Sequence, residues 1–295
     1  MTYGFGYKGS KSKIADKIIN FLPQANTLYD LFGGGGAITH CASLSGKYNK
    51  VVYNDKDDCA KLFEWAVDGI YKHTDPVRFV TRDMFFAEKD TNPLVKYEWS
   101  FGYNGLDYMY SKEIELFKYC LHNAVVYGNV YDFKKLYNID VPTFENVKGL
   151  RERRLKYWHF FENKGRTYQR AQHLERLERL EHLERLERLE IHNNSYLDFN
   201  ITNGIIYCDI PYVGTRKDCY KKFDYNKFYD WAENQKVPVY ISEYNMPADR
   251  FECVWSTPKR QLSTSKGASK LVNECIFVPK KQIKKGIIKN GCKKM

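Results

Sequence analysis

The sequence predicts an α/β protein with a doubly wound, mostly parallel sheet and an inserted, mainly helical segment. Short apolar runs typical of buried strands alternate with helical segments near both ends of the chain. Four glycines, Gly33–Gly36, separate the first of these strands from the next helix. The alternation stops at about residue 84 and resumes at Gly204, so we expect one α/β domain to form from two separate stretches.

The N-terminal stretch is expected to form helices and strands in turn. Pro23 ends the first helix, because proline cannot continue one. The expected elements are a helix over 12–22, a strand over 27–32, a helix over 37–45, a strand over 51–55 and a helix over 58–70. This order of strand, loop, helix and strand predicts parallel pairing.

The C-terminal stretch contains the motif with the clearest chemistry. Its expected elements are a strand over 205–209, a helix over 225–235, a strand over 237–242 and strands near 251–256 and 273–278. Pro211 cannot donate a sheet hydrogen bond, so the first strand ends there and displays Asp209 and Tyr212 at its carboxyl end, where open α/β sheets bind ligands. A carboxylate beside a flat ring suits a nucleobase, although residues 209–212 alone are also typical of a strand that ends in a turn.

Composition narrows the class of protein. The chain has 295 residues, a net charge of +11 and 16% aromatic residues, which favour a polyanionic partner, although surplus surface lysine would give the same charge. The eight cysteines lie at least eleven residues apart, so we expect reduced thiols and neither a zinc site nor a disulfide framework. There is no signal-peptide core and no apolar run of 18 residues, and we expect a soluble intracellular protein.

The glycine-rich turn indicates a nucleoside ligand. Glycines before a helix let a ligand approach the backbone, and Asp55 ends the second strand nineteen residues after Gly36, a spacing typical of an acid that binds ribose hydroxyls. The loop lacks the third glycine of G-x-G-x-x-G and the Gly-Lys-Ser/Thr of a P-loop. The pattern therefore fits a nucleoside that carries no pyrophosphate.

Together these motifs resemble the Dam-type adenine-N6 DNA methyltransferases, the alpha group of the D12 class. That family has an N-terminal G-x-K segment, a D-x-F-x-G-x-G loop, a target-recognition insert and a D-P-P-Y catalytic loop. Tyr7-Lys-Gly-Ser-Lys11, Asp30–Gly36 and Asp209–Tyr212 match the first, second and fourth of these. Further segments that resemble the family are 194–198, 239–245, 273–277 and, as in phage-encoded members, 99–104.

The resemblance implies a class I, Rossmann-like methyltransferase that uses S-adenosylmethionine and no metal. The implied cofactor-binding residues are Tyr7, Lys11, Asp30, Phe32, Gly33, Gly34, Gly36, Asp55, Asp198 and Asp209. The implied catalytic residues are Asp209, Ile210, Pro211 and Tyr212. Asp209 and the Ile210 carbonyl would accept hydrogen bonds from the two N6 protons of an adenine flipped out of the duplex. Tyr212 would stack on that base.

The implied partner is double-stranded DNA, bound by a monomer in a bacterial or phage-infected cytoplasm, as in restriction-modification systems. Basic and aromatic residues alternate over 149–170, where the family carries its recognition domain. The expected DNA-binding residues are Arg151, Arg153, Arg154, Lys156, Arg166 and Arg170. The alternative is a solvated basic face over a core.

The expected organisation is a catalytic domain over 1–83 and 191–280, a recognition insert over 84–172, a helical spacer over 173–190 and a basic tail over 281–295. The spacer consists of two identical, consecutive copies of the nine-residue sequence His-Leu-Glu-Arg-Leu-Glu-Arg-Leu-Glu. Leucine at every third position does not make a heptad, but Glu–Arg pairs four residues apart support a helix. A partner-binding arm is the alternative interpretation.

One residue departs from the family pattern. The family's second catalytic-loop position is proline, and here it is Ile210. Any residue supplies a backbone carbonyl, so the chemistry should survive, while the loop loses the stiffness of proline. Two alternatives therefore stay open: a decayed relative that only binds DNA, and a methyltransferase acting on another amino acceptor, such as cytosine N4 or RNA adenine.

Overall fold

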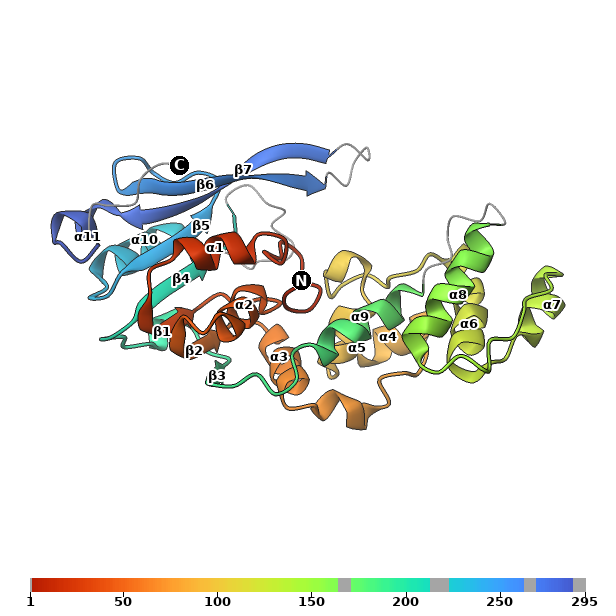
Figure 1. Ribbon diagram of the computed structural model, residues 1–295. Helices are drawn as coiled ribbons and strands as arrows, with labels where there is room; N and C mark the ends of the chain where they lie inside the picture. The colour runs from red at the N-terminus through yellow and green to blue at the C-terminus, as the bar shows by residue number, and fades with distance from the viewer. Residues whose placement is uncertain (1, 164–170, 213–222, 263–268, 289–295) are drawn as a thin grey trace. The chain divides into compact units, whose positions relative to one another are not determined.

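The computed structural model describes residues 2–163, 171–212, 223–262 and 269–288. The chain forms two compact units (Figure 1). The first unit comprises Met1–Gly4, Ser10–Ala60 and Leu186–Met295, and the second comprises Phe5–Gly9 and Lys61–Arg185.

The first unit is built on a seven-stranded sheet of strand order β3-β2-β1-β4-β5-β7-β6 (Figure 1). The strands are β1 (Ala25–Asp30), β2 (Tyr48–Asn54), β3 (Leu189–His192), β4 (Ile205–Asp209), β5 (Val239–Glu243), β6 (Phe251–Leu262) and β7 (Ser269–Pro279). The first five pair in parallel, and β7 pairs antiparallel with both β5 and β6. The predicted doubly wound, mostly parallel sheet is confirmed.

Helices cover both faces of this sheet. The helices of the unit are α1 (Ala15–Phe21), α2 (Ala37–Ser45), α10 (Tyr225–Asn234) and α11 (Lys280–Lys284), and the short η3 (Tyr196–Asp198) precedes β4. Side chains of α1 and α2 pack against Leu28 and Val51 on one face, and those of α10 pack against Ile206 and Val239 on the other. Because β4 is covered on both faces, it needs the continuous apolar run that the sequence shows.

The order of the strands places the ligand-binding edge between β1 and β4. The chain runs outward from β1 to β2 on one side, and β4 and β5 lie on the other, so the direction of winding reverses between β1 and β4. At such a switch point the carboxyl ends of the strands border a crevice that α/β proteins use for ligands. Asp30 ends β1 and Asp209 ends β4 at this edge.

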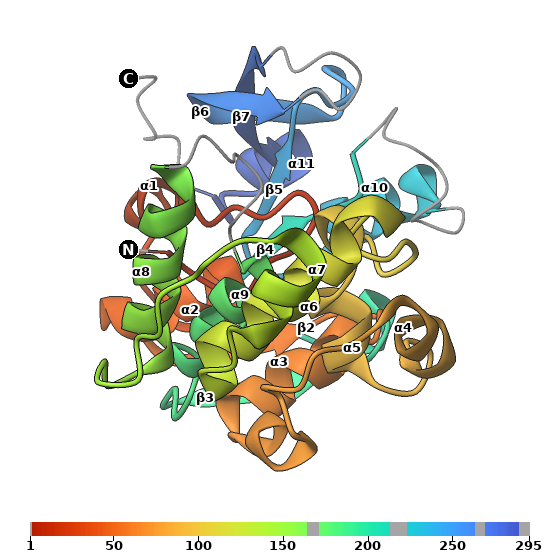
Figure 2. The same ribbon diagram turned by 90° about the vertical axis from the view of Figure 1, so that its right-hand side faces the viewer.

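The second unit is helical (Figure 2). Its elements are α3 (Cys59–Val67, which begins at the unit boundary), η1 (Ile70–Thr74), α4 (Arg82–Glu88), α5 (Pro93–Glu98), η2 (Phe101–Tyr103), α6 (Lys112–Tyr127), α7 (Tyr131–Tyr137), α8 (Leu150–Glu162) and α9 (Gln172–Glu181). Aromatic rings fill much of its core, where Trp99 stacks on His173 at a centroid distance of 4.6 Å. Much of the aromatic excess of the sequence therefore serves packing.

The helix expected over residues 173–190 is wrong in its second half. The first copy of the repeat lies in α9, where Leu174, Leu177 and Leu180 are buried. Residues three apart advance a helix by about 300°, so three such leucines span only about 120° and share one face. That face packs in the second unit, where α9 contacts α5 and α8, so α9 is a core helix and not a spacer.

The second copy leaves the helix although its sequence is identical. Arg185 and Arg188 adopt left-handed backbone conformations, with φ of 60° and 59°, and Leu189 begins β3. The Arg188 carbonyl accepts a hydrogen bond of 2.9 Å from the Val51 amide of β2. Pairing with a neighbouring strand thus overrides the local preference for helix.

Candidate active site

Residues 210–212, directly after β4, are fixed at two points. The Ile210 side chain is 1% exposed and packs in the core formed with α10. The Pro211 carbonyl accepts a hydrogen bond of 2.9 Å from the Tyr225 hydroxyl. Burial of the Ile210 side chain stabilises this position by about 1.5–3 kcal/mol.

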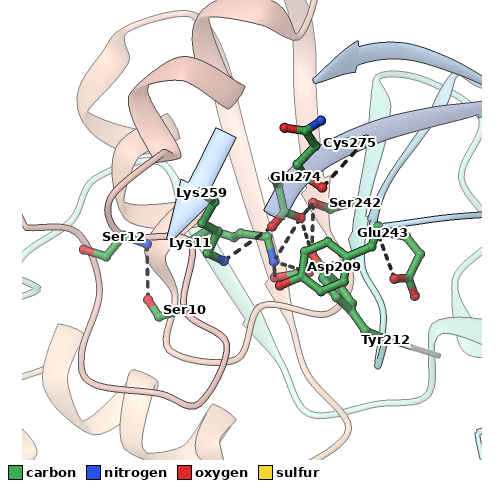
Figure 3. Close-up of polar contacts among 12 residues, drawn as sticks. Ser10, Lys11, Ser12, Asp209, Tyr212, Ser242, Glu243, Lys259, Glu274 and Cys275 are labelled. Carbon is green, nitrogen blue, oxygen red and sulfur yellow. Dashed lines mark hydrogen bonds and ion pairs between the residues drawn. The ribbon is translucent and has the colours of Figure 1, made fainter. Parts of the chain in front are cut away.

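Lys11 and Asp209 form a buried ion pair, although 197 residues separate them in the chain. The Lys11 ammonium is 2.6 Å from both carboxylate oxygens of Asp209 (Figure 3). It also lies 4.7 Å from the centroid of the Tyr212 ring. Lys11 is 3% exposed and the Asp209 side chain 20% exposed. The carboxylate and the ring thus hold a cationic nitrogen between them.

Glu274, on β7, is a further member of the site. It is completely buried and accepts hydrogen bonds from the hydroxyls of Tyr212 and Ser242, the second at 2.7 Å. Its oxygens also lie 3.6 Å from the Lys11 ammonium and 3.4 Å from the Lys259 ammonium. Figure 3 shows these side chains converging from β5, β6, β7 and the loop after β4.

Sequence reasoning assigned no role to Glu274 or Ser242. The available signal was a single acid inside the mostly apolar segment 271–278, because a charged residue is rarely buried without partners. The sheet register brings the positions together: Asp209 lies opposite Ser242, and Ser242 lies opposite Ile276, two residues after Glu274.

Opposite charges and burial compete at these carboxylates. Burial raises the pKa of Asp209 above its ordinary value, although Lys11 opposes the shift. Burial disfavours the charged form of Glu274 too, but Lys11 and Lys259 together hold its pKa below the ordinary value. Burial lowers the pKa of the Lys259 ammonium. Glu274 is consequently the more firmly ionised of the two acids.

Asp30 stands beneath the glycine-rich turn. It is 1% exposed, and its Oδ2 accepts a hydrogen bond of 2.8 Å from the Thr39 hydroxyl in the first turn of α2. Its Oδ1 is buried without a hydrogen-bond partner among the described residues. Burial raises the pKa of Asp30 to about 7, and Asp209 contributes in the same direction.

The glycine-rich turn is packed tightly on the protein itself. A Cβ atom on Gly33 would lie 2.2 Å from the Tyr53 ring, so a larger residue cannot fit there. Gly34 and Gly36 have left-handed φ values of 50° and 70°, which favour glycine. The Gly34 amide donates a hydrogen bond of 2.8 Å to Asp55, the acid after β2. Burial raises the pKa of Asp55 to about 6.

Phe32 and Asp198 occupy separate places near this turn. The Phe32 ring contacts those of Tyr196 and Phe228, at centroid distances of 5.3 and 5.7 Å. Asp198 accepts a hydrogen bond from the Ser195 amide as part of a capping box. It also lines a cavity of about 300 Å³ beside β1, β2 and β3, whose other lining residues include Lys50, Glu190 and His192.

Tyr7 belongs to the second unit. Its ring packs against Phe5 and Tyr97, at centroid distances of 6.4 and 5.9 Å. Its expected contact with the cofactor remains a prediction from the resemblance.

The expected DNA-binding residues differ in exposure. Arg151 is 76% exposed and Lys156 is exposed, both on α8. Arg153 donates a hydrogen bond to the Val126 carbonyl. Arg154 is 8% exposed and forms ion pairs with Glu175 at 2.6 Å and Glu178 at 3.1 Å, so its charge is neutralised inside the second unit. Arg166 and Arg170 lie outside the described residues.

Among the described residues, no group of three or more His, Cys, Asp or Glu side chains could hold a metal ion. None of the helices in the described ranges is long and apolar enough to cross a membrane.

Comparison with protein families identifies the family of this chain. A family model described as D12 class N6 adenine-specific DNA methyltransferase matches residues 7–245. The match includes Lys11, the glycine-rich turn and residues 209–212, and it ends before Lys259 and Glu274. No curated protein matches the chain.

Proposed function

The chain belongs to the D12 class N6 adenine-specific DNA methyltransferases, whose family model spans residues 7–245, and we propose that it methylates N6 of a flipped adenine in double-stranded DNA. The observation that carries the proposal is the geometry at the end of β4. There Asp209 and the Tyr212 ring already hold a nitrogen cation, the Lys11 ammonium, between them. A methylated N6 atom carries the same charge as it forms.

The residues around the glycine-rich turn fit S-adenosylmethionine, which when bound supplies the methyl group of its sulfonium. Asp55 would hold the ribose hydroxyls, since it already fixes the turn through Gly34 at the end of β2. Phe32 and the turn's backbone would border the nucleoside, and Asp198 would face the adenine. Asp30 would hold the end of β1 in place beside these residues, because it is buried and accepts a hydrogen bond from Thr39 of α2.

The chain's own residues would activate the amino group. Adenine N6 is a poor nucleophile because its lone pair is delocalised into the ring. Asp209 and the Ile210 carbonyl would accept hydrogen bonds from the two N6–H groups and draw the nitrogen towards a more nucleophilic geometry. The Asp209 charge would stabilise the N6 cation that develops, which loses one proton after the methyl group has been transferred. Tyr212 stacks on the flipped base. Positioning supplies much of the acceleration.

Arg151 and Lys156 are the proposed DNA contacts on α8. Both are exposed, so both can reach a phosphate without breaking the core. Arg154 instead stabilises the second unit through Glu175 and Glu178. We further propose that the enzyme acts as a monomer.

The test uses purified protein, double-stranded DNA and S-adenosylmethionine labelled in its methyl group. We expect label on adenine, and Asp209→Ala should abolish transfer while DNA retention on a filter stays close to wild type. The matched control is Asp249→Ala, which removes an exposed aspartate and should transfer normally.

Nucleoside analysis of the labelled product separates the alternatives. Label on N4 of cytosine, or on RNA but not on DNA, would assign a different amino acceptor. Wild-type protein that retains DNA and transfers nothing would identify a decayed relative and contradict the proposal.

A further inference from the structure

We propose that Glu274 is a positioning residue of the methyl-transfer site, which anchors the Tyr212 ring and offers Lys11 a second counter-charge, so that Asp209 can turn to the target amino group. The inference rests on the proposed function for its catalytic part. Its electrostatic part, the effect of Glu274 on Lys11 and Asp209, does not depend on which substrate is methylated.

Lys11 engages the Asp209 carboxylate. Both of its oxygens lie 2.6 Å from the Lys11 ammonium. Each carboxylate oxygen keeps a lone pair that can accept a hydrogen bond from N6, but Lys11 neutralises the Asp209 charge and so weakens the carboxylate as an acceptor. Asp209 therefore becomes a stronger acceptor when Lys11 moves away or shares its charge with another anion.

Lys11 can move away from Asp209 only if another anion lies nearby. Lys11 is 3% exposed, so water cannot replace Asp209 as its partner. A buried ammonium without a counter-charge is strongly destabilised. Glu274 lies 3.6 Å from the same nitrogen and is itself completely buried. A small movement of the flexible Lys11 side chain towards Glu274 would keep the cation paired and free Asp209.

Tyr212 is held at its hydroxyl group and along its ring. Its hydroxyl donates a hydrogen bond to Glu274 and lies 3.4 Å from the Ser242 hydroxyl. Its ring packs edge-on against Tyr244 at a centroid distance of 4.5 Å. A ring held at its hydroxyl end and along its side presents a fixed surface to a base. The strand that carries Glu274 thus fixes the stacking residue as well as the charge.

Lys259 completes the charge balance. Its ammonium is 3.4 Å from Glu274, so two carboxylates and two ammonium groups share the site, and their formal charges cancel. Lys259 keeps Glu274 ionised while Lys11 is still on Asp209. The titratable groups that act on Asp209 or feel its charge are Lys11, Lys259, Glu274, Asp30, Tyr207, Cys208, Tyr212 and Tyr244.

The test is Glu274→Gln, whose amide oxygen can still accept from Tyr212 and Ser242. We expect kcat to fall by about 10- to 100-fold, the loss typical of a misplaced catalytic group. We also expect the acid limb of the kcat–pH profile to move to lower pH. In the wild type, the Glu274 charge raises the pKa of Asp209 and the Lys11 charge lowers it. The variant lacks the Glu274 charge and keeps Lys11 paired with Asp209, so the pKa of Asp209 should fall. Simple loss of folded protein would lower the rate without moving that limb.

Two variants serve as controls. Glu243→Gln removes another buried carboxylate from β5, one residue after Ser242 on the opposite face of the strand, and should keep the wild-type rate and acid limb. Tyr212→Phe keeps the ring and removes its anchor, and should raise the KM for DNA while leaving the acid limb in place. A Glu274→Gln enzyme with wild-type kcat and acid limb would overturn the inference.

A measurement without turnover separates this inference from the proposed function. Carbon-13 NMR of labelled aspartate carboxyls, assigned with Asp209→Asn, follows Asp209 directly. A lower Asp209 pKa in Glu274→Gln than in the wild type supports the electrostatic part even if no substrate is methylated. An unchanged or higher pKa contradicts it even if the wild type proves an active adenine methyltransferase.

Discussion

The buried acid Asp30 should make the stability of this protein depend on pH in a definable way. Burial raises its pKa from 3.8 to about 7. An acid whose pKa is raised by folding costs no stability below its unfolded pKa, an increasing amount between the two values, and a constant amount above the folded value. The folded wild type is therefore penalised as the pH rises from about 4 to about 7.

The variant Asp30→Asn removes this charge and can still accept the hydrogen bond from Thr39. From the two pKa values, ionisation of Asp30 lowers the free energy of unfolding of the wild type by about 2 kcal/mol near pH 5 and about 4 kcal/mol near pH 8.5. The free energy of unfolding of the variant relative to the wild type should therefore rise by roughly 2–3 kcal/mol over that interval.

Urea denaturation followed by tryptophan fluorescence at several pH values measures this difference. Only its change with pH matters, because the constant cost of exchanging an oxygen for an amide group cancels. Asp249→Asn, at an exposed position, should show no such change. A flat difference for Asp30→Asn between pH 5 and pH 8.5 would show that Asp30 is not held in a raised-pKa environment.

Three further substitutions test packing and charge. Ile210→Ala should lower the free energy of unfolding by about 2–4 kcal/mol in chemical denaturation, since the side chain is 1% exposed, and an unchanged value would rule out the anchoring role. Arg154→Met should lower it by about 1–3 kcal/mol, because Glu175 and Glu178 lose their buried partner. Arg151→Gln should leave stability unchanged and reduce the salt dependence of DNA binding, d log K/d log[salt], by about 1. Equal DNA affinities at all salt concentrations would exclude a phosphate contact at Arg151.

Local patterns predicted the central strands well because those strands are buried on both faces. The run 205–209 can form little other than a core strand, and the break at Pro211 fixes where Asp209 stands. The motifs matched by the family model also lie in short contiguous segments, so one sequence was enough to find them.

The fate of the second repeat copy and the place of Glu274 could not be predicted, because both depend on contacts between distant segments. The repeated nonapeptide shows the limit most clearly, since one copy is helical and the identical second copy turns and enters β3. The nine shared residues cannot distinguish the two copies. The difference comes from β2, which pairs with the end of the second copy. The same holds for Glu274, whose partners Lys11, Tyr212 and Lys259 come from three other parts of the chain.

The β6–β7 hairpin also sets the order in which the site can form during synthesis. A ribosome makes Lys11 first, then Asp209, and Lys259 and Glu274 after both. A nascent chain that has emerged only as far as residue 245 has the whole region matched by the family model, yet it lacks two strands of the sheet and the second counter-ion of Lys11. On the inference above, premature termination in that interval yields a polypeptide with every motif of the matched region and an Asp209 whose charge Lys11 neutralises without a competing anion.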